Sequence, residues 1–165
     1  MSLIVAHFQR LAAYNRIANG LIYDAAARLD PEELWRDRRA FFTSIGGTLN
    51  HILVGDRIWL ARFEGGSSPS TGLDAILFED LADLRAARIK EDARIERFAA
   101  GLTEAYLDGE IRYVNNQGRD MADPTAVLVP HFFNHQTHHR GQVHDMLSQT
   151  DVPPPSLDMH RCFNP

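Results

Sequence analysis

The spacing of apolar residues along the chain predicts four long helices. In each of four segments, apolar side chains recur at intervals of three or four residues, which places them on one face of an α-helix. With 165 residues, the chain has the length of one ordinary domain. Four long amphipathic helices in one domain favour an all-α helical bundle over residues 1–165. The four segments are residues 3–29, 44–63, 78–101 and 123–149.

Short sequence signals predict where these helices begin. Thr43 or Ser44 is expected to cap the second helix, and Asp123-Pro124 combines a capping residue with a proline at the first turn of the fourth. The sequence PEELW, residues 31–35, is expected to form one short turn of helix. The third helix is expected to direct five apolar side chains inward, at Leu81, Leu84, Ile89, Ile95 and Phe98.

Two connections interrupt the helical pattern. Residues 64–72, EGGSSPSTG, are rich in glycine, serine and proline, which predicts a loop. In residues 110–121, short apolar runs flank an Asn-Gln-Gly sequence, which predicts a short β-hairpin between the third and fourth helices. This long connection leaves open, from the pattern alone, the order in which the helices run up and down the bundle.

The composition and charge exclude several classes of partner. Hydrophobic residues at 44% and charged residues at 24% are ordinary for a globular domain. A net charge of -5 without a run of basic residues argues against nucleic acid and anionic membranes as partners. No apolar run approaches the roughly 20 residues of a membrane span, and the first residues do not resemble a signal peptide. With Cys162 as the single cysteine, we expect a cytoplasmic protein.

Histidines are concentrated in the fourth predicted helix. Four of the eight histidines lie within residues 131–142, HFFNHQTHHRGQ. His131, His135 and His139 recur every four residues, and side chains at that spacing are near neighbours on a helix. Two imidazoles so placed can bind one metal ion at about 2.0–2.1 Å each. His138 is a competing partner for His135 at the edge of the same face.

A further ligand has to come from another helix, and His51 is the natural candidate. It lies among apolar residues, Gly55 leaves space beside it one turn later, and Trp59 supplies an apolar wall. Three neutral imidazoles leave positions open for water or substrate, which is typical of a catalytic site. Taken alone, His51 is better explained as a hydrogen-bonded core residue, and the pair His135 and His139 fits a metal site and an ordinary polar face equally well. Only their combination favours a metal site.

The sequences TLNHILVGDRIWLARF and HFFNHQTHHRGQVHDML resemble those of the DinB/YfiT-like proteins of bacteria, and the resemblance covers nearly the whole chain. It implies a four-helix bundle of up-down-down-up order, often a homodimer, with one divalent metal ion held by three histidines. Carried over residue by residue, the implied ligands are His51, His135 and His139. The resemblance thus selects His139 over His138 and leaves His131 outside the ligand set.

The resemblance implies two kinds of activity. Some DinB/YfiT-like proteins are thiol S-transferases or isomerases that use bacillithiol, mycothiol or glutathione, and others are described as metal-dependent hydrolases. We therefore expect water or a low-molecular-weight thiol, activated by the ion, to be the nucleophile, with no catalytic side chain identified. The alternative is a non-enzymatic metal-binding or stress-associated bundle protein. Zinc or nickel is expected first, while iron, manganese and cobalt also accept imidazole.

Several further side chains are expected near the metal site. Gln142, three residues after His139, is well placed to line a pocket. Asp56 is more readily interpreted as a surface or helix-pairing charge, because its position turns it off the ligand face. Arg140 is expected to pair with an acid on a neighbouring helix rather than with a substrate. The candidates for lining the pocket or orienting the ligands are Gln142, Trp59, Asp56, His131 and Tyr14.

Overall fold

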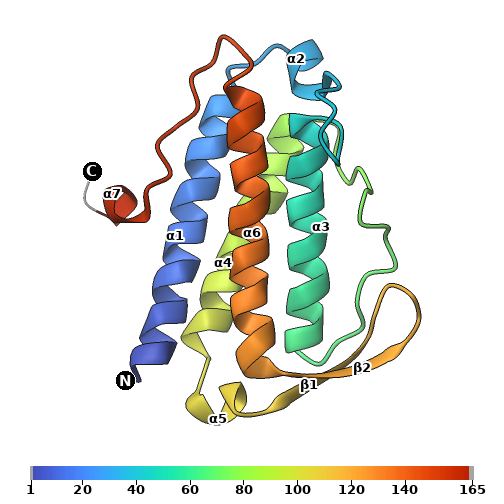
Figure 1. Cartoon of the computed structure of the whole chain (residues 1–165), viewed down its shortest axis with the longest axis vertical. Helices are drawn as coiled ribbons and strands as arrows, with labels where there is room; N and C mark the ends of the chain where they lie inside the picture. Colours follow the sequence, from blue (N-terminus) through green and yellow to red (C-terminus); the bar gives the residue numbers. More distant parts are fainter. Residues whose placement is uncertain (1, 164–165) are drawn as a thin grey trace.

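Four long helices form a bundle in the computed structural model, which describes residues 2–163 (Figure 1). Each long helix contacts two others, in the cyclic order α1, α4, α3, α6. In Figure 1, α1 and α6 run upwards while α3 and α4 run downwards, so the up-down-down-up order is confirmed. The four helices are α1 (Leu3–Ala26), α3 (Ile45–Phe63), α4 (Leu81–Ala100) and α6 (Thr125–Leu147).

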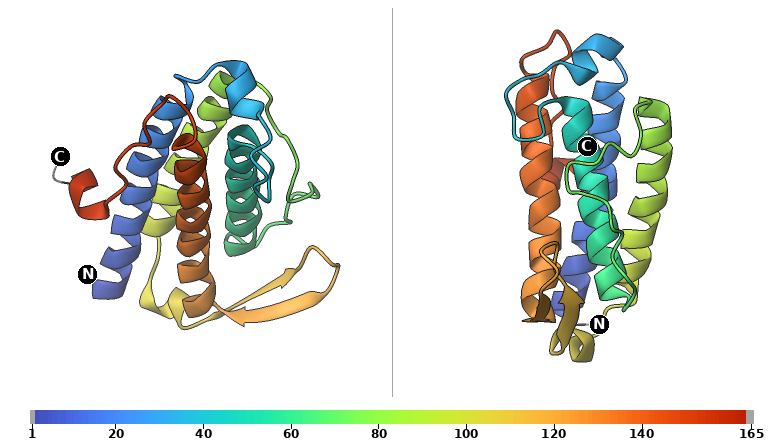
Figure 2. Two further views of the ribbon diagram at one scale, coloured as in Figure 1. Left: turned by 45° about the horizontal axis from the view of Figure 1, so that its top comes forward. Right: turned by 90° about the vertical axis from the view of Figure 1, so that its right-hand side faces the viewer.

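Shorter elements close the two ends of the bundle. An antiparallel hairpin joins α4 to α6 as predicted, with strands β1 (Glu110–Val114) and β2 (Asp120–Pro124). The hairpin and the connection from α3 to α4 both lie on the outer side of α3 (Figure 2). Three short helices complete the described chain: α2 (Pro31–Trp35), α5 (Glu104–Leu107) and α7 (Met159–Phe163).

The start of α6 differs from the prediction. Asp123 and Pro124 belong to β2, where Asp123 pairs with Ile111, and the helix begins at Thr125 without a side-chain cap. The Asp123 carboxylate instead accepts a hydrogen bond of 2.8 Å from the hydroxyl of Tyr113. The side chain of Asp123 therefore makes a cross-strand hydrogen bond in the hairpin and does not cap α6, although the local sequence had predicted that it would.

Helices α3 and α4 each begin directly after a residue whose side chain caps the helix. Ser44, rather than Thr43, caps α3, because its Oγ accepts a hydrogen bond of 3.0 Å from the backbone of Gly47. The start of α4 lies at Leu81, later than predicted, because the Asp80 carboxylate accepts hydrogen bonds from the next turn. Among residues 2–163, no helix has both the length and the apolar character needed to cross a membrane.

The core consists of two apolar clusters separated by a polar layer. One cluster lies toward the hairpin and the other toward α2. Between them, each long helix contributes buried polar side chains. In α4 this layer includes Arg88, whereas the neighbouring Ile89 is 61% exposed, so the prediction that Ile89 faces inward is wrong. The residues of this polar layer are Asn15, Asn19, Asp56, Arg88, Asp92, Gln136 and Arg140.

Candidate metal centre

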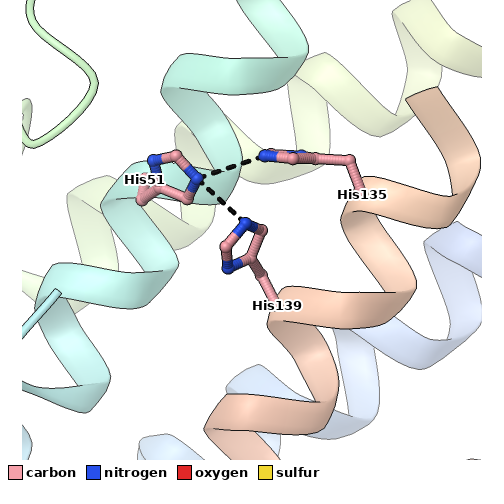
Figure 3. Close-up of side chains that lie close together, drawn as sticks. All are labelled: His51, His135 and His139. Carbon is pink, nitrogen blue, oxygen red and sulfur yellow. Dashed lines mark hydrogen bonds between the residues drawn. The ribbon is translucent and has the colours of Figure 1, made fainter. Parts of the chain in front are cut away.

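Three histidine side chains meet between α3 and α6 (Figure 3). Nε2 of His51 lies 3.1 Å from Nε2 of His135 and 3.1 Å from Nε2 of His139. One nitrogen from each ring lies within 4.8 Å of the other two. His135 and His139 are one turn apart on α6, and His51 faces them from the antiparallel α3. The structure thus brings together the three residues that helical spacing and family resemblance had singled out.

Hydrogen bonds to oxygen fix the tautomers of two of these rings. Nδ1 of His51 lies 2.7 Å from the carbonyl oxygen of Leu73, and Nδ1 of His139 lies 2.8 Å from Oε1 of Gln142. Since both partners are acceptors, Nδ1 carries the proton in each ring and Nε2 carries a lone pair. Metal-binding histidines characteristically donate their second ring nitrogen in this way.

The contact between Nε2 of His51 and Nε2 of His139 is not a hydrogen bond in these tautomers. Both atoms present lone pairs across 3.1 Å, which repel unless a cation lies between them. Two imidazole nitrogens bonded to one ion at about 2.0–2.1 Å are separated by roughly 2.9–3.4 Å for bond angles between octahedral and tetrahedral. The observed separation lies within that range, so this donor set fits a divalent ion.

His135 is positioned mainly by packing, because in the described chain no hydrogen bond to a backbone or carbonyl oxygen holds its Nδ1. Its Nδ1 is buried and has no hydrogen-bond partner among residues 2–163. A Cβ added to Gly55 would lie 2.7 Å from Cε1 of His135, so the ring occupies the space that glycine leaves on α3. The space predicted beside Gly55 is therefore filled by a candidate ligand from α6.

Phe42 covers the other side of the centre. Its ring is stacked on that of His51, with centroids 3.6 Å apart and an interplanar angle of 16°, and its edge faces His139 at 5.6 Å. The ring comes from the connection between α2 and α3. Sequence reasoning did not assign Phe42 to the site, because nothing local indicates that this connection folds over His51.

Burial keeps the three imidazoles neutral. It lowers the pKa of His51 from 6.5 to about 4, with the hydrogen bond to Leu73 opposing the shift. For His135, burial and then the neighbouring histidines lower the pKa from 6.5 to about 3. Burial also lowers the pKa of His139. All three rings are thus neutral at pH 7, which is the charge state that metal binding requires.

A cavity of about 420 Å³ opens beside His51 and His135, toward the hairpin. Trp59 and His131 both line it, as predicted, with their ring centroids 5.3 Å apart. This volume suits a small molecule, and the cavity places it next to two of the three candidate ligands. The further lining residues are Gly55, Ile58, Arg62, Leu73, Tyr113, Asn115, Asn116 and Gln117.

Other predicted site residues lie outside this cavity. Gln142 lies behind His139, which it orients, and His138 is an exposed side chain beside Gln142. Tyr14 does not line the cavity either, because its hydroxyl donates to the carbonyl of Leu157 at 2.7 Å. Its ring lies under the guanidinium of Arg140, on the α1 side of the bundle. Packing of α1 against α6 therefore turns Tyr14 away from the metal centre.

Asp56 is a fully buried helix-pairing charge and not a surface residue. Its carboxylate accepts hydrogen bonds from Arg88 at 2.5 Å and from Gln136 at 2.8 Å. Burial raises the pKa of Asp56 from 3.8 to about 6, with Arg88 and Gln136 opposing the shift. Because Gln136 follows His135 in α6, this bond also ties the ligand-bearing turn to α3 and α4.

The rest of the polar layer links α1 to the same network. Arg88 lies 3.0 Å from the carboxylate of Asp92, which also accepts hydrogen bonds from Asn15 and Asn19. Arg140 donates to the side chains of Asn15 and Asn19, so it pairs with amides of α1 and not with an acid. Sequence reasoning missed this layer. The sequence feature that could have indicated this layer is the presence of asparagines within the apolar stripe of a helix.

The fold and the site define a class: a four-helix bundle with a candidate three-histidine centre between two antiparallel helices. Comparison with known sequences gives the family. Residues 3–164 match the DinB family, to which the chain belongs. The chain is also similar to Protein DinB of Bacillus subtilis (strain 168), at 30% identity over 150 residues, which cover 85% of this chain and 84% of that protein. The resemblance drawn from the residues is confirmed.

Proposed function

We propose that the chain binds one divalent metal ion through Nε2 of His51, His135 and His139, and that it is an enzyme acting on a low-molecular-weight thiol. The proposal rests on one observation: three neutral imidazoles bring their Nε2 atoms together, with two pairs 3.1 Å apart. A cavity next to this point favours an enzyme over a non-enzymatic binding protein, because it gives a small molecule access to the ion. Zinc or nickel is the proposed ion.

The chemistry follows from the donor set. When bound, a divalent ion lowers the pKa of a water or thiol ligand toward neutrality and so supplies a nucleophile at pH 7. The chain's own part is to hold Nε2 of His51 and His139 unprotonated, through their Nδ1–H bonds, and to keep the His135 ring neutral by burial. Trp59 and His131 then shape the space in which the substrate is oriented.

The residues of the cavity favour a thiol over water as the nucleophile. Hydrolysis usually requires a carboxylate or imidazole that accepts a proton from water. Within the described part of the chain, no aspartate or glutamate lines this cavity. His131 is the observation that favours a metal-dependent hydrolase as second candidate, because its ring centroid lies 6.3 Å from that of His135. A thiol has an ordinary pKa of about 8.5, against about 15.7 for water, so it needs less help from a base to lose its proton.

The metal content of the purified protein and of three histidine variants tests the binding part of the proposal. We expect elemental analysis to find about one divalent ion per chain in the wild type and in His138→Ala, whose replaced ring is exposed. His135→Ala is expected to lose the ion, because the two remaining ligands lie on different helices. Circular dichroism checks that each variant is folded. Loss of the ion in His138→Ala with retention in His139→Ala would contradict the assignment.

A screen of low-molecular-weight thiols against alkylating electrophiles tests the enzymatic part. Thiol consumption is expected to depend on the metal and to be absent from His135→Ala. Metal-dependent ester or amide hydrolysis without thiol consumption, lost in His131→Ala, would instead support the hydrolase.

A further inference from the structure

Arg62 lies in the wall of the metal-site cavity without an acidic partner. It is on α3, eleven residues after His51, which is about three helical turns and brings it back to the same face. In the described part of the chain, its side chain donates hydrogen bonds only to neutral oxygens, those of Ser68, the backbone of Val114 and Asn116, at 3.2–3.3 Å. Within residues 2–163, no ion pair joins Arg62 to a carboxylate.

This setting is unusual for a buried cation. Arg62 is only 7% exposed, and a charge removed from water is normally paired with an opposite charge. Arg88, which is also buried, contacts two carboxylates. The guanidinium of Arg62 instead lies 4.6 Å from the ring centroid of Trp59 and 4.4 Å from that of Tyr113. Aromatic rings attract a cation but leave its net charge in place.

Part of this guanidinium remains available to a ligand. The three hydrogen bonds of Arg62 use Nε and Nη2. Nη1 has no hydrogen bond within residues 2–163, and it is not among the enclosed atoms that lack a partner, so it keeps access to solvent. Asn116, which also lines the cavity, accepts from Arg62 through Oδ1, and its Nδ2–H groups have no hydrogen bond within residues 2–163. The hydrogen-bond donors of Arg62 and Asn116 in this part of the cavity are therefore suited to binding an anion.

The separation between Arg62 and the histidine centre also determines how long an anion has to be to contact both. Eleven residues of α-helix rise about 16 Å, so the backbone of Arg62 lies well beyond that of His51 along α3, and both residues line the cavity. Arg62 and Tyr113 also line a second cavity of about 790 Å³, between the hairpin and residues 66–73, so the guanidinium stands where the two cavities meet. A short ligand can occupy one end only, and an elongated ligand can reach both.

We propose that Arg62 binds a carboxylate at the far end of an elongated substrate whose sulfur reaches the histidine centre. The substrate class is thus a thiol with a carboxylate several bonds from its sulfur. This inference rests on the proposed metal function. A carboxylate is specified because the planar guanidinium matches its geometry. No acidic side chain of the described cavity wall competes with it for Arg62.

Binding of model thiols to the Co²⁺-loaded protein tests the proposal, with the sulfur-to-cobalt absorption band as readout. The matched probes are ω-mercaptooctanoate and ω-mercaptooctanol, which differ only in the charged end. We expect the acid to bind the wild type at least about ten-fold more tightly than the alcohol, a difference of about 1.4 kcal/mol. Arg62→Gln is expected to abolish this preference while leaving the affinity for the alcohol unchanged.

Two controls separate charge recognition from a structural role of Arg62. Arg62→Lys keeps the charge and is expected to retain part of the preference. Arg57→Gln removes a cation from the same helix that pairs with Glu91 outside the cavity, and is expected to behave as wild type. Equal binding of acid and alcohol by the wild type would overturn the proposal. Equal weakening of both probes in Arg62→Gln would also overturn it, because that result indicates a structural role.

A measurement without metal distinguishes failure of the anion site from failure of the metal function. In the metal-free protein, octanoate is expected to shift the Nε–Hε NMR signal of Arg62, whereas octanol is not. If Co²⁺ or thiol binding is absent but this shift occurs, the metal function is wrong and the carboxylate site stands. If the thiol band appears and octanoate produces no shift, Arg62 does not bind the carboxylate.

Discussion

His135 and Gly55 face each other across the candidate centre, where the His135 ring occupies the space beside the glycine. Nδ1 of His135 has no hydrogen-bond partner in residues 2–163, so the orientation of the ring depends largely on this packing. A single methyl group on α3 can therefore disturb a ligand on α6. At the scale of the residue, the site depends on the lack of a Cβ atom at Gly55 as much as on the three imidazoles.

Gly55→Ala is expected to weaken metal binding by about 10–100-fold, the range typical of disturbed ligand support. The new Cβ would lie 2.7 Å from Cε1 of His135, and the ring has to turn away to relieve the contact. The free energy of unfolding should change little, because alanine in a helix is favoured over glycine by about 1 kcal/mol, which offsets the local strain. Competition titration with a chelator gives the affinity, and urea unfolding of the metal-free protein gives the stability.

Gly20→Ala on α1 is the matched control. A Cβ at Gly20 meets nothing within 4 Å, so this variant is expected to gain roughly 0.5–1 kcal/mol with unchanged metal affinity. Wild-type affinity in Gly55→Ala would show that Gly55 does not position His135.

The four long helices are connected to one another through their buried polar layer. Asp56 on α3, Arg88 on α4, Asn15 on α1 and Gln136 on α6 belong to one network of hydrogen bonds and ion pairs. The network lies at the level of the histidines, since Gln136 directly follows His135. At the scale of the element, a charged layer therefore fixes how the helices that carry the ligands face each other.

Arg88→Met is expected to lower the free energy of unfolding by about 3–5 kcal/mol. The substitution leaves the Asp56 and Asp92 carboxylates buried without their main counter-charge. Arg85→Met on the same helix is the control, because Arg85 pairs with the exposed Asp24 and such a pair contributes at most about 1 kcal/mol. Urea unfolding measures both variants. A change below about 1 kcal/mol in Arg88→Met would mean that the network contributes little to stability.

The candidate metal centre joins two antiparallel helices whose ligands are 84 and 88 residues apart in the chain. A ligand that binds the folded state and not the unfolded chain stabilises the fold by mass action. At the scale of the whole molecule, metal binding and unfolding are therefore coupled. Protons compete with the ion for the same imidazoles, which makes this coupling dependent on pH.

Zn²⁺ is expected to raise the melting temperature at pH 7 and, almost undiminished, at pH 5.5. The sign follows from the imidazoles: burial lowers the pKa of His51 to about 4 and that of His135 to about 3, so both stay neutral at pH 5.5. The stabilisation should be lost as the pH falls toward these values. Differential scanning calorimetry with Zn²⁺ or with a chelator measures it. Loss of the effect already near pH 6.5 would mean that the rings titrate like exposed histidines.

What the sequence determined by itself is mostly local. Apolar spacing defined the four helices, the turn sequence defined the hairpin, and the interval of four residues placed His135 and His139 on one face. These features depend on interactions between residues a few positions apart in the chain, so the sequence alone is enough to predict them. His51 was singled out by its apolar surroundings, because a polar ring there needs a partner from elsewhere in the fold.

Tertiary structure decided which distant residues meet. The carbonyl of Leu73 and the ring of Phe42 reach the site from segments whose sequences carry no sign of it. The guanidinium of Arg62 comes from α3 itself, but only the folded hairpin shows that no carboxylate of the described chain lies beside it in the cavity. Packing also placed Arg88 inside and Ile89 outside, because the carboxylates of Asp56 on α3 and of Asp92 one turn later on α4 stabilise a buried cation there. Such choices depend on the rotation of each helix against its neighbours, and the sequence of one helix does not contain that information.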